Sequence, residues 1–544
     1  MRYFSKGQYF GFYVDLMGQK ELYSSIPHIG KLNNPSESKK VLSTQYVVET
    51  AFTCVRSFLS KFKENAQYAL DLYVREGYEK YREMSKNGLE DHLSRLEYGT
   101  QQFSDSLIFY LKDEGPIAAD VFTYIVPLFV LVLRQFLPNK VVYRGSVTCG
   151  EGWEAGPNTL EGPVFRELIR LEEQVANYPR IVVGDTLYAR CESVAKTYKP
   201  GKDLSITDFL GTLCSGFEQD FDGINCLNLC SRGFVSSLRK NELHCHRDIQ
   251  IASQKFLYNE FKKFSDRASE AHTASMAGVY SKVAVKYAMA LNAGSRYCQA
   301  LGVKEPDYES LGLNYEPLPD NYANTVVDIS EYVVLRLSFW EMNGDDIKQS
   351  KAVNRAVCLL RGLAQRMVNK SSDVHPELLT SQFANVLVLA IKNDSSAIKY
   401  MKDALSEIST MVPRFVSRGV LVRGSLVGGN GWPVFGETLC GPIMQDSYEY
   451  ECKVAAPFFR IVIDRHAASF LSEYSFHDLD GVEVVDYLKI RNLKSLCNEK
   501  LKSRYECDIN NALQMIQSNP KPEIGGKDAR LALSALMTYY QGPQ

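Results

Sequence analysis

Residues Arg144 to Val183 read RGSVTCGEGWEAGPNTLEGPVFRELIRLEEQVANYPRIVV, and Arg423 to Ile463 read RGSLVGGNGWPVFGETLCGPIMQDSYEYECKVAAPFFRIVI. The two stretches share Arg-Gly-Ser, Gly-Trp, Thr-Leu and Gly-Pro, and they stay in register without a gap as far as Gly-Pro. The second copy then gains one residue before Arg460, which matches Arg180. A repeat of this length indicates two copies of one domain rather than a solenoid of small units.

The length and composition fit a globular protein with two domains. A chain of 544 residues exceeds one ordinary domain, and its hydrophobic content of 45% and charged content of 23% are ordinary for the globular class. A net charge of −2 gives no general attraction to nucleic acid or to anionic membranes. The cysteines are scattered and no signal segment is recognisable, so we expect a cytoplasmic protein with reduced thiols. The most apolar run, Val121 to Leu133, is too short to span a membrane and predicts a buried helix.

In the first copy, strand patterns alternate with helical patterns. An acid inside an apolar strand is costly unless it is paired or metal-bound, so Asp15 at the end of the first strand is either a site residue or an acid wetted by the loop that follows. The predicted elements are a central strand at Gln8 to Leu16, helices within Lys31 to Gly99, a hairpin at Thr100 to Leu111 with Asp105 at its mouth, a strand at Val141 to Cys149, an amphipathic helix at Gly162 to Tyr178 and a strand at Arg180 to Val183.

The second copy follows the same plan. We expect a strand at Asn324 to Ile329 with Asp328 in the position of Asp15, and a hairpin at Ser381 to Ala390 with Asn385 in place of Asp105. The pattern Asp-x-Asp-Gly, which begins at Asp220 and again at Asp478, is typical of a hairpin turn.

The predicted fold class is α+β, with helices packed on a mostly antiparallel sheet in each copy. The predicted domains are residues 1–305 and 324–544, and residues 306–323, which are rich in proline, asparagine and tyrosine, form the linker between them.

Two acids and several arginines could carry chemistry in the first copy. Asp15 and Asp105 on neighbouring strands could reach one divalent cation, and arginines could bind phosphates with two hydrogen bonds each. Arg166 and Arg170 share one helix face, and the alternative is a solvated face on which they pair with Glu167 or Glu173. Arg144 and Arg180 persist in the second copy as Arg423 and Arg460, which suggests either a structural role or phosphate binding.

The first copy resembles a class III nucleotidyl cyclase domain, especially that of the bacterial Pycsar-type pyrimidine cyclases of phage defence. The resemblance is carried by FYVDLMG, FSDSLIFY, YRGSVTCGE, GPVFRELIRLE and YPRIVV, in this order. It implies a ferredoxin-like βαββαβ core with added helices, arranged here as a tandem, pseudo-dimeric pair. It further implies that Asp15, Asp105 and the backbone carbonyl of Leu16 bind two magnesium or manganese ions. In the family the 3′-hydroxyl of a nucleoside triphosphate attacks the α-phosphate and pyrophosphate leaves, at a head-to-tail interface to which the other domain contributes an asparagine and an arginine.

Several positions depart from the family pattern. Arg170 matches the family arginine, but Arg166 stands where the family has asparagine. Gln101 and Thr159 stand where purine-selective members carry a lysine and an aspartate or similar residue, which favours UTP or CTP over ATP and GTP. In the second copy Gln445 and Glu449 replace the asparagine and arginine, and Asn385 replaces an acid, so we expect a degenerate catalyst.

The resemblance therefore implies an enzyme that makes a 3′,5′-cyclic pyrimidine monophosphate for anti-phage signalling, read by a separate cyclic-nucleotide effector. The expected catalytic residues are Asp15, Asp105, Arg166 and Arg170, and the expected substrate-binding residues are Arg144, Gln101, Thr159 and Arg180. The first copy would pair with the second copy, with another chain, or with both, and neither nucleic acid nor a membrane is expected as a partner. The alternative is a cyclase-like protein without catalytic activity that senses a nucleotide or a phage component.

Overall fold

The structure is a computed structural model of the 544-residue chain. It divides into two compact units, and the described part of one ends at residue 300 while that of the other begins at residue 329. The predicted linker at 306–323 lies outside the described residues. The structure describes residues 6–17, 61–62, 64, 91, 93–103, 106–114, 118–119, 121–122, 125–126, 129, 133, 137, 142–156, 159–197, 216–220, 222–227, 240–300, 329–341, 378–383, 385–394, 397–434, 438–471, 474–478, 480–486, 499–518, 523–524, 527–528 and 530–541.

The first unit is built on a sheet with the strand order β2-β3-β1-β4-β6-β8-β7, to which β5 adds by pairing with β4. Among the strands that the structure describes in this unit, β4 and β6 pair in parallel and the other pairs are antiparallel. The strands are β1 (Gly7–Met17), β2 (Tyr98–Phe103), β3 (Ser106–Lys112), β4 (Val142–Gly156), β5 (Thr159–Glu161), β6 (Ile181–Val183), β7 (Phe217–Gln219) and β8 (Asn225–Leu227).

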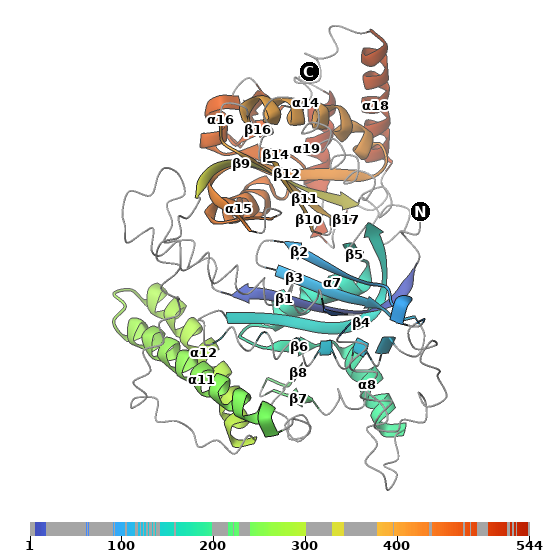
Figure 1. The fold of residues 1–544 in the computed structure, drawn as a ribbon. Helices are drawn as coiled ribbons and strands as arrows, with labels where there is room; N and C mark the ends of the chain where they lie inside the picture. Colours follow the sequence, from blue (N-terminus) through green and yellow to red (C-terminus); the bar gives the residue numbers. More distant parts are fainter. Residues whose placement is uncertain are drawn as a thin grey trace. The chain divides into compact units, whose positions relative to one another are not determined.

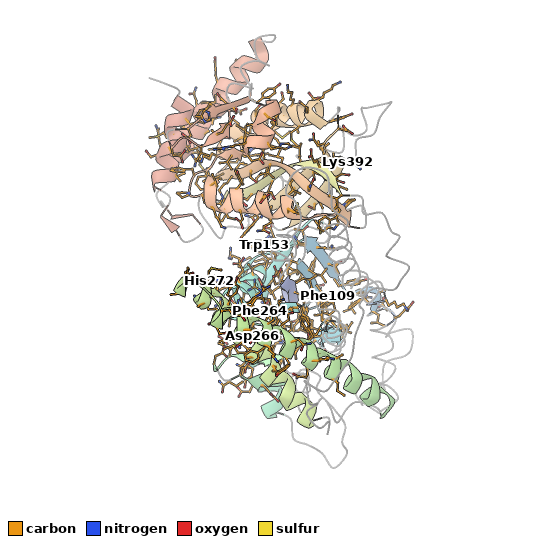
Figure 2. The ribbon with its side chains drawn as sticks, turned by 90° about the vertical axis from the view of Figure 1, so that its left-hand side faces the viewer. Phe109, Trp153, Phe264, Asp266, His272 and Lys392 are labelled. Atoms are coloured by element: carbon orange, nitrogen blue, oxygen red, sulfur yellow. The ribbon has the colours of Figure 1, made fainter. Side chains whose placement is uncertain are left out.

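The helices of the first unit flank this sheet. The described residues between 118 and 133 are helical and mostly buried, as the apolar run predicts. Phe122 stacks on Phe10 of β1, and Phe129 packs edge-to-face against Phe12. The helices are α7 (Pro163–Arg170), the π-helix η2 (Leu171–Val175), α8 (Asp185–Thr197), α11 (Lys240–Ser269) and α12 (Ala274–Ala300). Helices α11 and α12 form a hairpin whose turn contains His272, and Phe264 of α11 stacks on Tyr287 of α12 (Figures 1 and 2).

The second unit repeats the first strand for strand. Its sheet has the order β10-β11-β9-β12-β14-β16-β15, and β13 pairs with β12. The strands are β9 (Ser330–Glu341), β10 (Leu378–Phe383), β11 (Val386–Lys392), β12 (Val420–Val434), β13 (Thr438–Cys440), β14 (Ile461–Ile463), β15 (Ser475–His477) and β16 (Glu483–Val485), with a small separate pair β17 (Glu523–Ile524) and β18 (Lys527–Asp528).

In the second unit the helices lie on both faces of the sheet. Helix α15 lies on one face, and α14, α16 and α18 lie on the other (Figure 1). Alternate residues of β9 such as Leu335 and Leu337 join the main apolar core on the α14 face. The helices are α14 (Ala397–Val416), α15 (Pro442–Glu449), the π-helix η4 (Tyr450–Ala455), α16 (Arg465–Leu471), α18 (Glu499–Gln517) and α19 (Arg530–Gln541).

The four strands at one side of each sheet have the order of a ferredoxin-like βαββαβ fold. In the first unit these are β2-β3-β1-β4, and in the second they are β10-β11-β9-β12, with antiparallel pairing throughout. A chain that forms β1, crosses over to β2, turns back into β3 and crosses over again to β4 gives this order. The predicted α+β class, with two similar domains in tandem, is therefore confirmed by the topology.

The repeated tripeptide Arg-Gly-Ser is explained by packing. A Cβ at Gly145 would lie 2.2 Å from the carbonyl oxygen of Tyr13, and one at Gly424 would lie 2.4 Å from that of Arg336, so the close approach of the two central strands requires glycine. The next residue links β4 to α7, because Ser146 Oγ donates a hydrogen bond to the carbonyl of Leu168 at 2.7 Å. Ser425 Oγ makes the same bond to Ser447 at 2.6 Å.

The repeated Gly-Trp and Gly-Pro pairs form one further shared contact. Gly162 and Gly441 precede α7 and α15 with φ of 101° and 113°, a backbone region that only glycine adopts readily. A Cβ at Gly441 would lie 2.8 Å from the ring of Trp432. The glycine thus allows the chain to turn into the helix while it packs on the buried tryptophan.

Substitution of Gly441 tests this packing against a matched glycine. Gly481 also has positive φ, 76°, but nothing lies within 4 Å of its Cβ position. We expect Gly481→Ala to cost about 1 kcal/mol from backbone strain alone. Gly441→Ala should cost more, about 1–3 kcal/mol from the backbone plus the displacement of Trp432. Urea unfolding followed by tryptophan fluorescence measures both, and equal midpoints for the two variants would contradict the account.

Candidate functional site

Asp15 lies near the end of β1, between the two strands that flank it. In the register of the sheet it pairs with Ser106 on β3 and with Arg144 on β4. Ser106 Oγ donates to Asp15 Oδ1 at 2.8 Å and itself accepts a bond from Tyr13 Oη at 3.1 Å. Arg144 Nε lies 3.5 Å from Asp15 Oδ2. The acid is thus held by neighbours rather than simply wetted by a loop, and its side chain remains 19% exposed.

Burial and these neighbours act in opposite directions on the protonation of Asp15. Burial raises the pKa of Asp15, and the positive charge of Arg144 and the hydrogen bond from Ser106 lower it. The net direction is upward. A carboxylate of this kind is stabilised in its charged form by any further cation that binds it.

Arg144 is shared between Asp15 and a second carboxylate, Glu172. Its Nε makes its shortest contact with Glu172 Oε1, and the Glu172 side chain is only 2% exposed. A buried carboxylate is stable only when it is paired. Arg144 therefore lies between two acids of the first domain, and whether it also binds a phosphate, as the sequence predicts, stays a prediction. The pKa of Lys286, on α12, is lowered by burial and by the positive charge of Arg144.

The π-helix η2 places Glu172 in this position. Helix α7 ends at Arg170, and the wider turn from Leu171 to Val175 follows it directly. The sequence predicts one amphipathic helix over Gly162 to Tyr178, so the π-helical turn is a difference. A π-turn shifts the faces of a helix, and such turns are frequent at functional sites. Here it leaves Arg170 exposed and directs Glu172 into the protein two residues later.

The two arginines of α7 are exposed, as their helical spacing predicts. Arg170 binds Glu167 through two hydrogen bonds, from Nε at 2.8 Å and from Nη2 at 2.7 Å, and its side chain is 47% exposed. This is the pairing with Glu167 that a solvated helix face predicts. An exposed ion pair contributes little to stability, so the guanidinium can exchange Glu167 for a ligand at small cost.

Arg180 fastens the end of η2 to the Asp-x-Asp-Gly turn. Its Nη1 and Nη2 lie 3.0 and 2.7 Å from the two oxygens of Asp222, and Nη1 also reaches Asp220. Nη2 donates to the carbonyl of Val175 at 2.7 Å, and Tyr178 Oη bonds to Asp220. The guanidinium of Arg180 therefore already binds Asp222, Asp220 and the carbonyl of Val175, and this geometry favours a structural role over phosphate binding.

The second domain repeats this fastening. Arg460 binds Asp480 at 2.9 and 2.7 Å, Asp478 at 2.7 Å and the carbonyl of Val454 at 2.9 Å. The turns that carry the acids connect β7 to β8 and β15 to β16. The predicted hairpin turns are confirmed.

The remaining predicted residues do not all lie at the Asp15 end of the sheet. Thr159 pairs with Gly156, at the opposite end of β4 from Arg144. Leu16 is the residue after Asp15 on β1 and is 4% exposed. Gln101 on β2 is 3% exposed, and among the described residues neither of its amide atoms has a hydrogen-bond partner. Thr159, on β5, is 4% exposed. Asp105 falls between β2 and β3 in the sequence and lies outside the described residues.

The register of the second domain corrects one prediction. Arg423 pairs with Ser338, whereas Arg144 pairs with Asp15, so Ser338 occupies the position of Asp15. The prediction that Asp328 holds this position is wrong; Asp328 precedes the strand and lies outside the described residues. The error arose because Val-Val-Asp imitates the Tyr-Val-Asp of β1, while the buried residues that form the strand come later. Asn385 does stand at the turn before β11, as predicted, and its backbone carbonyl accepts from Phe339.

At the corner of the second domain that corresponds to Asp15, Arg144 and Glu172 of the first, three charged side chains pair with one another. Glu451, the counterpart of Glu172, accepts from Arg336 at 3.0 Å, from Arg423 at 2.8 Å and from Ser338 at 2.7 Å. The charge of these arginines lowers the pKa of Glu451 against the effect of its burial. The side chains of Arg336, Arg423 and Glu451 are only 6%, 13% and 3% exposed.

The second domain also lacks the exposed arginines of α7. Gln445 and Glu449 take the places of Arg166 and Arg170 on α15, and Gln445 Nε2 donates to Glu449 Oε1 at 3.2 Å. Glu449 also pairs with Lys453 at 2.9 Å. A carboxylate here repels a phosphate, so the described residues of this helix support a non-catalytic second domain.

The sequence reasoning missed Glu172 and Glu451. The signal was available, because each glutamate follows the glycine of its Gly-Pro pair by the same interval in both copies. It also missed Ser106 and Tyr13, which orient Asp15.

Comparison with known proteins gives little further information. No protein-family model matches the sequence, and no curated protein matches it. A crystal structure of a class III adenylyl cyclase-like ATP-binding protein from Pseudomonas aeruginosa is similar at 11% sequence identity and a TM-score of 0.39, over 90% of each chain. Similarity this low carries no argument about activity. Among the helices that the structure describes, none is both long and apolar enough to cross a membrane.

The Asp-x-Asp-Gly turns should give the protein a defined acid sensitivity. The hydrogen bonds from Arg180 lower the pKa of Asp222, and those from Arg460 lower the pKa of Asp480. A lowered pKa in the folded state stabilises the fold above the ordinary aspartate pKa of about 4, and this contribution is lost as the pH falls through the folded-state value.

We therefore expect Asp222→Asn to be less stable than the unmodified protein at pH 5, with a difference that shrinks below about pH 3. Urea unfolding midpoints at a series of pH values measure this difference. A difference that stays constant with pH would show that Asp222 acts without its charge.

Proposed function

We propose that the chain is a nucleotidyl cyclase whose first domain converts a nucleoside triphosphate, UTP or CTP, into a 3′,5′-cyclic monophosphate and pyrophosphate. One observation carries this proposal. A partly exposed carboxylate, Asp15, lies near the end of the central strand of a ferredoxin-like sheet, and it pairs in register with Ser106, the residue that follows Asp105 in the sequence. In the cyclase family that the sequence resembles, the two metal-binding acids stand at the positions of Asp15 and Asp105.

The residues at this corner suit a hard divalent cation. Asp15 has oxygen lone pairs left after its bonds to Ser106 and Arg144, and carboxylates with carbonyl oxygens are the ligands that magnesium and manganese prefer. The second acid of the proposal is Asp105, which the resemblance to the cyclase family supplies. Asp15, Asp105 and the Leu16 carbonyl would hold two ions, which would stabilise the attacking and leaving oxygens of phosphoryl transfer.

The other residues bind and orient the substrate. Arg170 and Arg166 extend from the exposed face of α7 and would bind the phosphate charge that develops during transfer. Gln101 would read the base, since its buried amide has no hydrogen-bond partner among the described residues and can both donate and accept. A uracil or cytosine edge, which carries both donors and acceptors, matches such an amide.

The second domain would serve as a non-catalytic partner. It lacks the acid at Ser338 and the arginines of α7, and its own charges fill the corner. A complete site therefore requires the first domain to pair with that of another chain, or to receive an arginine from elsewhere. The cyclic product would act on a separate effector in anti-phage signalling, from a cytoplasmic location.

The alternative is a cyclase-like sensor without activity. The incomplete second domain favours it, because Gln445 and Glu449 stand where the family has an asparagine and an arginine. Incubation of the purified protein with each of the four ribonucleoside triphosphates and manganese, followed by mass spectrometry, separates the two functions. A cyclic pyrimidine product supports the enzyme; efficient cyclisation of ATP contradicts the proposed base preference. Nucleotide binding without any product, also when lysate of phage-infected cells is added, supports the sensor.

Substitution of the proposed metal acid should abolish the activity. We expect Asp15→Asn and Asp105→Asn to form no detectable cyclic product, because each loses a charged ligand. Ser338→Ala is the matched control at the same register position of the second domain, and it should keep its turnover. Product formation by Asp15→Asn at the rate of the unmodified protein would remove the mechanism.

The α7 arginine offers a second matched pair. Loss of one donor to transition-state charge typically lowers kcat by about 10²–10³-fold, so we expect Arg170→Ala to fall in this range. Glu449→Ala, at the equivalent position of α15, should leave kcat within about twofold, because it removes no such donor. Steady-state rates of pyrophosphate release measure both. Equal losses in the two variants would show that Arg170 has no special role.

A further inference from the structure

Arg144 lies between two carboxylates and can neutralise either of them. Its Nε contacts Glu172 at the shorter distance, and it reaches Asp15 at 3.5 Å. A guanidinium that bound Asp15 with full bidentate geometry would occupy the oxygens that a cation needs. The strength of the Glu172 contact therefore determines how much of Asp15 stays available.

The fold restrains Glu172 beside Arg144. Its side chain is 2% exposed, and η2 directs it inward. The far end of η2 is held by the bond from Arg180 to the carbonyl of Val175. The preceding helix is held to β4 by the bond from Ser146 to the carbonyl of Leu168. The glutamate is thus fixed at both ends of its segment.

The second domain has the same arginine-glutamate pair but no acid at the position of Asp15. It keeps the glutamate and the arginine, as Glu451 and Arg423, but has Ser338 where the first domain has Asp15. It then adds Arg336 to the same glutamate, at the position that Tyr13 holds in the first domain. The first domain instead has two acids, Asp15 and Glu172, beside a single arginine.

We propose that Glu172 is a positioning residue that draws Arg144 toward itself, limits the contact of Arg144 with Asp15 and so keeps the Asp15 carboxylate available to a divalent cation. The inference rests on the proposed function, since it concerns the same metal site. It assigns the shared arginine-glutamate pair two roles. The pair stabilises the helix-sheet contact in both domains, and in the first domain it also sets the charge available at Asp15.

The test compares Glu172→Gln with Glu451→Gln in the full-length protein. Both variants remove a buried carboxylate from an arginine, but only the first frees an arginine that lies beside a metal acid. Manganese binding, measured by electron paramagnetic resonance of the free ion, is the readout, because it does not depend on turnover. We expect Glu172→Gln to bind manganese about 10–100-fold more weakly, as is typical when a residue that orients a ligand is lost. Glu451→Gln should keep the affinity of the unmodified protein.

A double variant separates positioning from loss of fold. Arg144→Gln in the Glu172→Gln background removes the competing guanidinium together with the unpaired charge, and it should restore most of the manganese affinity. Circular dichroism melts of all variants show whether the first domain is folded. If the folded Glu172→Gln variant binds manganese as the unmodified protein does, or if the double variant stays as weak as the single one, the inference is wrong.

A further variant distinguishes this failure from failure of the proposed function. Asp15→Asn should abolish manganese binding to the first domain. If the unmodified protein binds no manganese, or if Asp15→Asn binds it equally well, the metal site itself is absent and both proposals fail. If Asp15→Asn loses binding but Glu172→Gln does not, only the role of Glu172 fails.

Discussion

A buried glutamate paired with an arginine of the central sheet determines how the helix-sheet contact of each domain is built. Removing one partner of such a pair leaves an uncompensated buried charge, which typically costs about 3–5 kcal/mol. The arginine comes from β4 or β12, and the glutamate comes from a π-helix above it. The glycine and serine after the arginine, and the glycine-tryptophan contact before the helix, bring these two elements close enough for the pair to form.

Around this shared pair the two domains have diverged in charge. In the first domain Asp15 adds a second carboxylate beside the arginine, and its corner stays partly exposed. In the second domain Ser338 and Arg336 replace the acid and the tyrosine, and the three charged side chains there are nearly buried. Trp340 and Tyr448 lie against the two guanidinium groups and complete the closure. The same scaffold thus supports an open corner in one copy and a closed one in the other.

The sequence predicted the elements that follow periodicity and turn chemistry. The strand that ends near Asp15, the hairpin after Gln101 and the Asp-x-Asp-Gly turns agree with the structure because each is set by local residues. The π-helix was not predictable, since no spacing of apolar residues marks an extra residue in one turn. The sequence did not show that Ser338 takes the position of Asp15. Strand register is decided by which face is buried, and the Val-Val-Asp string before the strand resembles the Tyr-Val-Asp of β1. The role of Glu172 depends on a contact with Arg144 from a distant strand, which sequence spacing alone does not show.

The central claim is that the first domain binds a divalent cation with a nucleoside triphosphate and the second does not. Crystals grown with manganese and a non-hydrolysable UTP analogue, with data collected at the manganese absorption edge, test this claim most directly. We expect anomalous peaks beside Asp15 and none beside Ser338. Peaks beside Ser338, or no peak at Asp15 in crystals that show the bound analogue, would contradict the account.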